Sequence, residues 1–308
     1  MKINLLRNSV FIIFLFTLIS CGKKEENTLS ESKYILRYHF DDPGSDSVFI
    51  FKESNSKNLL ILLNKGDDKS KIKEILKISS IEYDDLINSL FGNGLIKKTD
   101  NGKFVPSFPI IDFAEEKEIN TISKPIGEDI SLIIIDRLKL IEDKMLKLPS
   151  YSQNNHSLRY FLFSEVLLNN LQIKNIKENF IKSRAPERNG KHLYIALIEE
   201  SISKEENSLE PFISAEQKQK GNAFEFNNSI NFTPAEIAQL QIIADVIKKD
   251  LSDYLNGKRR ILLGNYSKSN LQKTTSFKEY TYWVYQYIIR DAVKSLIKHG
   301  IIRSPKEN

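Results

Sequence analysis

The 308-residue chain contains a single cysteine, Cys21. One thiol cannot form an intramolecular disulfide or build a cysteine-based zinc site. The four histidines, His39, His156, His192 and His299, have no second histidine two to four residues away. The sequence also lacks an HExxH motif, an acidic calcium loop, a Walker-type glycine-rich loop and a GxSxG elbow. We therefore predict no metal, no cofactor and no catalytic residues, and favour a protein that is not an enzyme. A triad or carboxylate pair assembled in space stays open, because serines and acids are plentiful.

A strong excess of one charge is also missing. The chain has 45 Lys and Arg against 40 Asp and Glu, a net charge of +5, and the two signs alternate along its length. Proteins that bind nucleic acid usually show a larger, clustered basic excess, so nucleic acid is not an expected partner. Hydrophobic residues at 41% and charged residues at 28% indicate a chain that folds around a buried core.

The first 21 residues, MKINLLRNSVFIIFLFTLISC, have the layout of a secretory signal. Lys2 and Arg7 precede an apolar run over 10–19 that is interrupted only by Thr17. Roughly ten apolar residues are too few to span a bilayer, which needs ~20. The run therefore predicts export rather than a transmembrane helix.

The end of this run, Leu18-Ile19-Ser20-Cys21, resembles the bacterial lipobox. In that pattern a branched apolar residue, a tolerant position and a small residue precede an invariant cysteine. The resemblance implies cleavage before Cys21, acylation of its thiol with palmitate-type chains, and a membrane partner bound through that lipid. Each buried CH₂ group contributes ~0.8 kcal/mol to such anchoring. The alternative is an ordinary signal or N-terminal anchor in which Cys21 is incidental.

Residues 22–32 are polar and predict a flexible tether. Within them, Lys24-Glu25-Glu26 resembles the short signal, a lysine with two acids, that sends Bacteroidetes lipoproteins to the cell surface. This resemblance implies a location in the bacterial cell envelope, lipid-anchored at the outer membrane. A solvated tether without export information is the alternative.

The stretch 58–108 has a recognisable order of elements. Apolar periodicity predicts helices over 59–64, 68–77 and 81–92, and strand-like runs follow at 95–98 and 103–105. Asn101-Gly102 between these runs is a strong hairpin signal. Three helices followed by a hairpin resemble a winged helix-turn-helix domain, and LINSLFGNGLIKKTDNGKFVPS is similar to the third helix and wing of such regulators. Upstream, KYILRYHF and SVFIF predict two strands around a Pro-Gly turn.

The charges of this stretch do not suit DNA binding. The third predicted helix begins with Glu82, Asp84 and Asp85, which would face phosphates badly. Residues 58–105 hold eight lysines against seven acids, so they supply little of the attraction that drives DNA affinity. We expect a scaffold or protein-binding role for the winged-helix-like segment.

The rest of the chain predicts a mainly helical domain with a small sheet. We expect a linker over 109–125, helices over 128–148, 157–181 and 277–299, a buried strand over 193–198 and a polar loop over 199–231. Thr233-Pro234-Ala235-Glu236 predicts a helix start with a capping box, in a helix that ends at Gly257. The predicted fold class is α+β and mostly helical: signal peptide 1–20, lipidated tether 21–32, winged-helix-like domain 33–113 and mainly helical domain 114–308.

Two groups of residues are candidates for binding. Arg184, Arg188, Lys191 and His192 lie on a turn between a helix and a strand and could hold an anion or an acidic partner. Tyr282, Trp283 and Tyr285 belong to an aromatic-rich helix and could lie partly on the surface, where they would stack on sugars or anchor a protein.

The sequence thus favours a membrane-tethered lipoprotein that acts as a non-catalytic binding or assembly module, with a protein or glycan partner. Two alternatives stay open: a winged-helix DNA-binding regulator, and an exported enzyme that acts on glycans. The second alternative needs a cleft with two carboxylates ~5–10 Å apart beside exposed aromatic side chains.

Overall fold

The computed structural model describes residues 33–41, 54–152, 155–200, 225–226 and 230–304. The predicted signal peptide, lipobox and tether lie outside these residues. So do the second predicted strand, SVFIF, and most of the predicted polar loop over 199–231. The described part is α+β and mostly helical with small sheets, as predicted.

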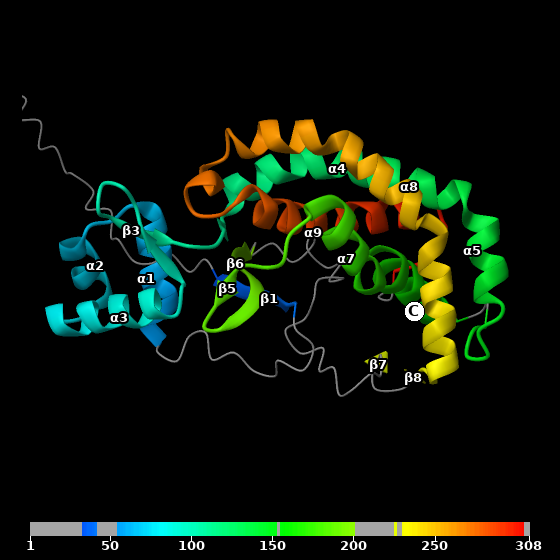
Figure 1. The fold of residues 1–308 in the computed structure, drawn as a ribbon, viewed down its shortest axis with the longest axis horizontal. Coiled ribbons are helices and arrows are strands. Elements are labelled where there is room, and N and C mark those ends of the chain that lie inside the picture. The colour runs from blue at the N-terminus through cyan, green and yellow to red at the C-terminus, as the bar shows by residue number, and fades with distance from the viewer. Residues whose placement is uncertain (1–32, 42–53, 153–154, 201–224, 227–229, 305–308) are drawn as a thin grey trace, which may run out of the picture.

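A small sheet lies at the centre of the molecule (Figure 1). Strand β6 (Lys191–Glu200) pairs antiparallel with β1 (Lys33–Phe40), in a register from Lys33 opposite Glu200 to Phe40 opposite Leu193. Strand β4 (Ile110–Ile111) pairs parallel with β6 on its other edge, and β5 (Glu187–Arg188) forms a short hairpin with the start of β6. β1 therefore pairs with a strand more than 150 residues away.

The side chains of β6 alternate between two hydrophobic cores. Leu193, Ile195 and Leu197 pack into the core of the N-terminal helices, whereas Tyr194 and Ala196 pack into the core of the C-terminal helices. Successive residues of a strand point to opposite faces, so one strand can serve both cores. A strand covered on both faces is apolar throughout, which explains the continuous run over 193–198. The two predicted domains share this sheet.

The N-terminal elements follow the predicted order. Helices α1 (Ser54–Lys65), α2 (Lys69–Leu76) and α3 (Ser80–Gly92) precede the hairpin of β2 (Ile96–Lys98) and β3 (Phe104–Pro106). The Asp68 carboxylate caps α2, and Ser79 with Glu82 forms a capping box at the start of α3. The resemblance to a winged helix stays a prediction that rests on this order.

The C-terminal part is a set of helices packed around a buried centre. Its elements are α4 (Phe113–Asp136), α5 (Leu138–Met145), α6 (His156–Phe161), the π-helix η1 (Leu162–Leu168), α7 (Asn170–Ile176), the π-helix η2 (Lys177–Ile181), the strands β7 (Glu225–Phe226) and β8 (Ile230–Asn231), α8 (Pro234–Tyr266), the 3₁₀ turn η3 (Asn270–Lys273) and α9 (Phe277–Lys298). Figure 1 shows α4, α8 and α9 running side by side above α7.

Four predicted boundaries are wrong. The predicted helix over 128–148 is divided at Arg137 into the end of α4 and the helix α5. Residues 113–125 are helical rather than a linker, because Asp112 caps α4 and Pro125 lies on its exposed side. Proline there frees the carbonyl of Thr121, which is also exposed and can bond water. Helix α8 continues past Gly257 to Tyr266. The predicted helix over 157–181 is divided by two π-helices and a break at Asn169.

Helices α4 and α9 approach each other closely at Gly127. A Cβ atom at this position would lie 2.7 Å from the backbone nitrogen of Ala292 and 2.8 Å from Cβ of Asp291. Only a residue without a side chain fits such an approach. Polar bonds flank the crossing: Ser123 Oγ donates to the Asp291 carboxylate at 2.6 Å.

Candidate functional site

The turn predicted to bind an anion is a tight β-hairpin. Asn189 and Gly190 have φ values of 51° and 69°, the positive values that a two-residue type I′ turn requires. The turn reverses the chain between β5 and β6 and directs Arg188 inward. Only 3% of Arg188 is exposed.

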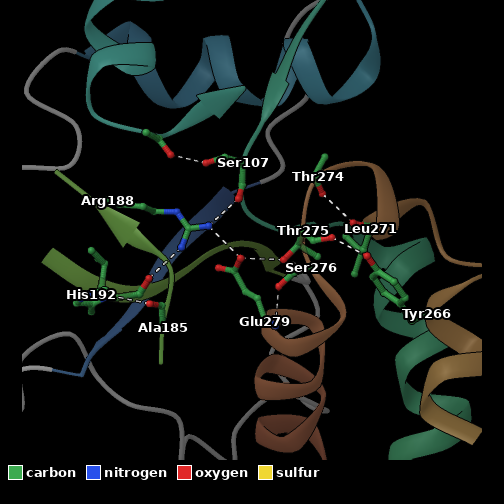
Figure 2. Close-up of polar contacts among 12 residues, drawn as sticks. Ser107, Ala185, Arg188, His192, Tyr266, Leu271, Thr274, Thr275, Ser276 and Glu279 are labelled. Atoms are coloured by element: carbon green, nitrogen blue, oxygen red, sulfur yellow. Dashed lines mark hydrogen bonds and ion pairs between the residues drawn. The ribbon is translucent and has the colours of Figure 1, made fainter. Parts of the chain in front are cut away.

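Arg188 joins three segments inside the protein (Figure 2). Its guanidinium donates to the Leu193 carbonyl at 2.9 Å, to the Ser107 carbonyl at 2.6 Å and to Oε2 of Glu279 at 2.9 Å. Glu279 lies in the first turn of α9 and also accepts from Thr275 Oγ1 at 2.9 Å. The prediction that Arg188 is available to an external anion is therefore wrong.

Two polar atoms of this buried ion pair lack hydrogen-bond partners. Within the described part of the chain, Arg188 Nε and Glu279 Oε1 have no hydrogen-bond partner. Burial raises the pKa of Glu279, although Arg188 opposes that effect. Removing one member would leave a buried charge, which costs more than the pair contributes.

The other three residues of the predicted anion site have different surroundings. Arg184 is exposed. The Lys191 ammonium lies 5.7 Å from the ring centroid of Phe40, and Nδ1 of His192 lies 2.9 Å from the carbonyl oxygen of Ala185.

The predicted surface aromatics are buried. Tyr282 and Tyr285 are 0% exposed and Trp283 is 4% exposed. Helix α9 contacts α4, α8, η1 and β6, so neighbours cover several of its faces rather than one. The Tyr285 hydroxyl donates to the Leu168 carbonyl at 2.6 Å. These rings cannot stack on a surface glycan, which removes the aromatic platform that the glycan-enzyme alternative needed.

A polar cluster that the sequence did not predict lies on the face of the sheet that packs against the C-terminal helices. We call it the His39 cluster; its members are His39, Asp41, Lys177, Tyr194 and Tyr282. The register places His39 opposite Tyr194, and the Tyr194 and Tyr282 rings stack with centroids 3.8 Å apart. The Lys177 ammonium donates to Nε2 of His39 at 2.9 Å and to the Asp41 carboxylate.

Electrostatics keep the imidazole of this cluster neutral. Burial and the adjacent Lys177 lower the pKa of His39 to about 3. An ammonium group has no lone pair, so Nε2 of His39 must accept and the ring proton belongs on Nδ1. Burial also raises the pKa of both tyrosines, which stay protonated. The cluster is thus suited to joining β1 to η2 rather than to moving protons near neutral pH.

Two hydroxyls of the cluster lack protein partners. Within the described residues, the hydroxyls of Tyr194 and Tyr282 are buried and have no hydrogen-bond partner. A buried unpaired hydroxyl costs roughly 1–3 kcal/mol. Nothing local in the sequence indicates this cluster, because Asp41 and Lys177 lie 136 positions apart.

One further buried acid lies in the π-helix η1. Oε2 of Glu165 accepts from the side-chain amides of Asn169 and Asn170, each at 3.0 Å. Burial raises the pKa of Glu165 to about 7, while the Asn169 bond acts in the opposite direction. Its protonation state therefore changes near neutral pH.

The outward face of α3 carries exposed apolar side chains. Ile81 is 74% exposed and Phe91 is 52% exposed, and the Phe91 ring meets Phe104 of the hairpin edge to face at 5.9 Å. Asp84, whose carboxylate accepts from the Lys69 ammonium at 2.6 Å, and Asp85 lie between them and are also exposed. We call Ile81, Asp84, Asp85, Phe91 and Phe104 the α3 face. A mixture of apolar and acidic side chains is suited to protein contact.

In the described ranges, His, Cys, Asp and Glu side chains form no group of three that could hold a metal ion. None of the helices that the structure describes combines the length and apolar character needed to span a bilayer. No protein-family model, curated protein or solved structure matches the chain.

Proposed function

We propose that the protein is a lipid-anchored protein of the bacterial cell envelope that acts as a binding or assembly module. The observation that carries the proposal is Leu18-Ile19-Ser20-Cys21, in which the sole cysteine of the chain ends an apolar run and precedes a polar tether. Two or more acyl chains on one residue hold a protein firmly at a membrane.

The α3 face supports the binding part of the proposal. Large side chains as exposed as Ile81 and Phe91 mark contact surfaces when they gather beside polar groups. Asp85 on the same face repels the phosphates of DNA, and Asp84 neutralises Lys69, so a protein partner fits this surface better than a duplex does.

Acylation is tested in cells with two matched variants. Cys21→Ala removes the acylated thiol, whereas Ser20→Ala keeps a small residue before the cysteine. We expect wild type and Ser20→Ala to fractionate with membranes and to incorporate a palmitate analogue, and Cys21→Ala to do neither. A wild-type chain found in the cytoplasm with Met1 intact contradicts the proposal.

The α3 face is tested by a photo-crosslinking residue placed at Phe91, with Lys139 on α5 as the exposed control. We expect a discrete adduct from position 91 that Ile81→Ser weakens. Adducts of equal yield from both positions contradict a specific contact at α3.

A further inference from the structure

The tether joins the folded body at one end of the central sheet. Residues 22–32 separate Cys21 from β1, and a chain of that length reaches at most roughly 40 Å. β1 begins at Lys33, opposite the last residue of β6, and β4 ends beside Ile198 of the same strand. The backbone nitrogen of Phe113, at the start of α4, donates to the Glu199 carboxylate at 3.1 Å. The first turn of α4 therefore lies where the tether enters.

The connection between α8 and α9 lies at this same end. Ser269 Oγ donates to Oε2 of Glu115 at 2.7 Å, and the backbone nitrogen of Asn270 donates to Oε1 at 3.2 Å. Figure 1 shows this connection beside the beginning of α4. The last turns of α8, η3 and the first turns of α4 thus form one surface close to the tether.

This surface has a one-sided charge. In the ranges 113–125 and 258–278, the one exposed acid is Glu118. The exposed cations there include Lys117, Lys124, Arg260, Lys268 and Lys273, and we call these five residues the basic end. Three large apolar side chains, Phe113, Ile261 and Leu263, are also exposed there. By contrast, exposed acids and bases are nearly balanced over 136–147 and 234–253. The acids are Asp136, Asp143, Asp245 and Asp253, and the bases are Arg137, Lys139, Lys147, Lys248 and Lys249.

We propose that the basic end faces the bilayer that holds the lipid of Cys21 and binds its anionic headgroups. The orientation rests on the proposed lipid anchor, but the affinity of the basic end for anionic lipid does not. The short tether keeps this end within reach of the surface, and each lysine close to an anionic membrane adds about a factor of five in affinity. Exposed Phe113 and Ile261 add apolar contact at the headgroup boundary.

The affinity is measured without the lipid, so that it is separate from acylation. The polypeptide from residue 21 to Asn308, carrying Cys21→Ala, contains every described residue. It is sedimented with vesicles of phosphatidylcholine, with or without about one-third phosphatidylglycerol, at ~0.1 M salt. We expect binding only with phosphatidylglycerol, and its loss at ~0.5 M salt.

Matched pairs of substitutions locate the binding surface. Lys268→Gln with Lys273→Gln is expected to lower the partition coefficient about 30-fold, as two factors of about five predict. Lys248→Gln with Lys249→Gln, on the balanced half of α8, is expected to leave it nearly unchanged. Equal binding to vesicles with and without phosphatidylglycerol overturns the proposal, and so do equal effects of the two pairs of substitutions. Binding to duplex DNA in preference to anionic vesicles also overturns it.

The orientation is measured on the acylated protein in vesicles. With Cys21 acylated, a single cysteine can be introduced for a fluorophore, either Gln272→Cys at the basic end or Gln241→Cys in the first half of α8. Both positions are exposed. We expect a headgroup quencher to quench the label at 272 and not at 241, and equal quenching overturns the orientation. Absence of acylation with intact vesicle binding would instead overturn the proposed lipid anchor alone.

Discussion

Glu165 makes the stability of this protein depend on pH in a direction that can be calculated. Its carboxylate is buried in η1 and accepts two amide hydrogen bonds, but no cation is among the causes of its pKa shift. We expect Glu165→Gln to keep the bonds from Asn169 and Asn170, because a glutamine carbonyl accepts as a carboxylate does. The substitution removes the ionisation and little else.

The magnitude follows from the difference between two pKa values. Burial raises the pKa of folded Glu165 from 4.5 to about 7, so the folded state holds its proton more tightly than the unfolded chain does. That preference stabilises the fold fully below pH 4.5 and is lost as pH rises to 7. At 1.36 kcal/mol for each pKa unit, the loss is about 3 kcal/mol. The stability of Glu165→Gln should not decrease in this way as pH rises.

The measurement is urea denaturation of the chain from Gly22 onward at pH 4.5, 6 and 8. We expect the free energy of unfolding of Glu165→Gln, relative to wild type, to increase by about 3 kcal/mol between pH 4.5 and pH 8. Glu128→Gln, at an exposed position of α4, is the control and should show no such trend. A difference between Glu165→Gln and wild type that does not change with pH would refute the reasoning.

Three further predictions concern packing and the polar clusters. Gly127→Ala should destabilise the fold by about 1–3 kcal/mol in thermal or urea unfolding, because the new Cβ would overlap α9. Gly257→Ala, whose Cβ would meet no atom within 4 Å beyond its chain neighbours and the helix's own backbone, should stabilise it by about 0.5–1 kcal/mol. Equal effects of the two would contradict a tight crossing. Arg188→Met should cost about 3–5 kcal/mol by leaving Glu279 unpaired, and adding Glu279→Leu should recover much of it; additive losses in the double mutant would argue against a coupled pair. The His39 side chain stays neutral in the folded protein, so the stability that it contributes is lost as pH falls below 6.5 towards 3. In a Glu165→Gln background we expect about 1–2 kcal/mol less stability at pH 5 than at pH 7, and His39→Gln should abolish that difference.

Local signals located most helix starts. The capping box of Thr233 with Glu236 is present as predicted, because its bonds span only three residues. The box of Ser79 with Glu82 has the same spacing but was not predicted. Gly300, with φ 69°, follows α9, which ends within one residue of the predicted boundary at 299. The hairpin of β2 and β3 follows from the Asn101-Gly102 turn between two short apolar runs.

Where helices continue or break was harder to predict. Pro125 and Gly257 are residues that usually end helices, yet both lie inside helices whose exposed sides tolerate them. The spacing of apolar residues over 162–181 does not distinguish the π-helices from an α-helix. Packing between distant elements, rather than local preference, decides each of these cases.

The predictions that Arg188 and the α9 aromatic side chains lie at the surface were wrong for a related reason. Arg188 lies in a polar turn, and the sequence does not reveal that Glu279, 91 positions away, draws it into the interior. Tyr282, Trp283 and Tyr285 point in several directions from α9, and only the number of neighbouring helices determines how many are covered.

By itself, the sequence determined the lipobox prediction, the caps, the amphipathic helices and the α+β class, because each depends on residues within one or two turns of one another. Only the tertiary structure decided that β1 pairs with β6, that one strand serves two cores, and that Arg188 and the aromatic side chains of α9 are internal. It also decided that the connection between α8 and α9 lies against the first turn of α4. These features depend on contacts between residues separated by tens to hundreds of positions, which no local pattern records.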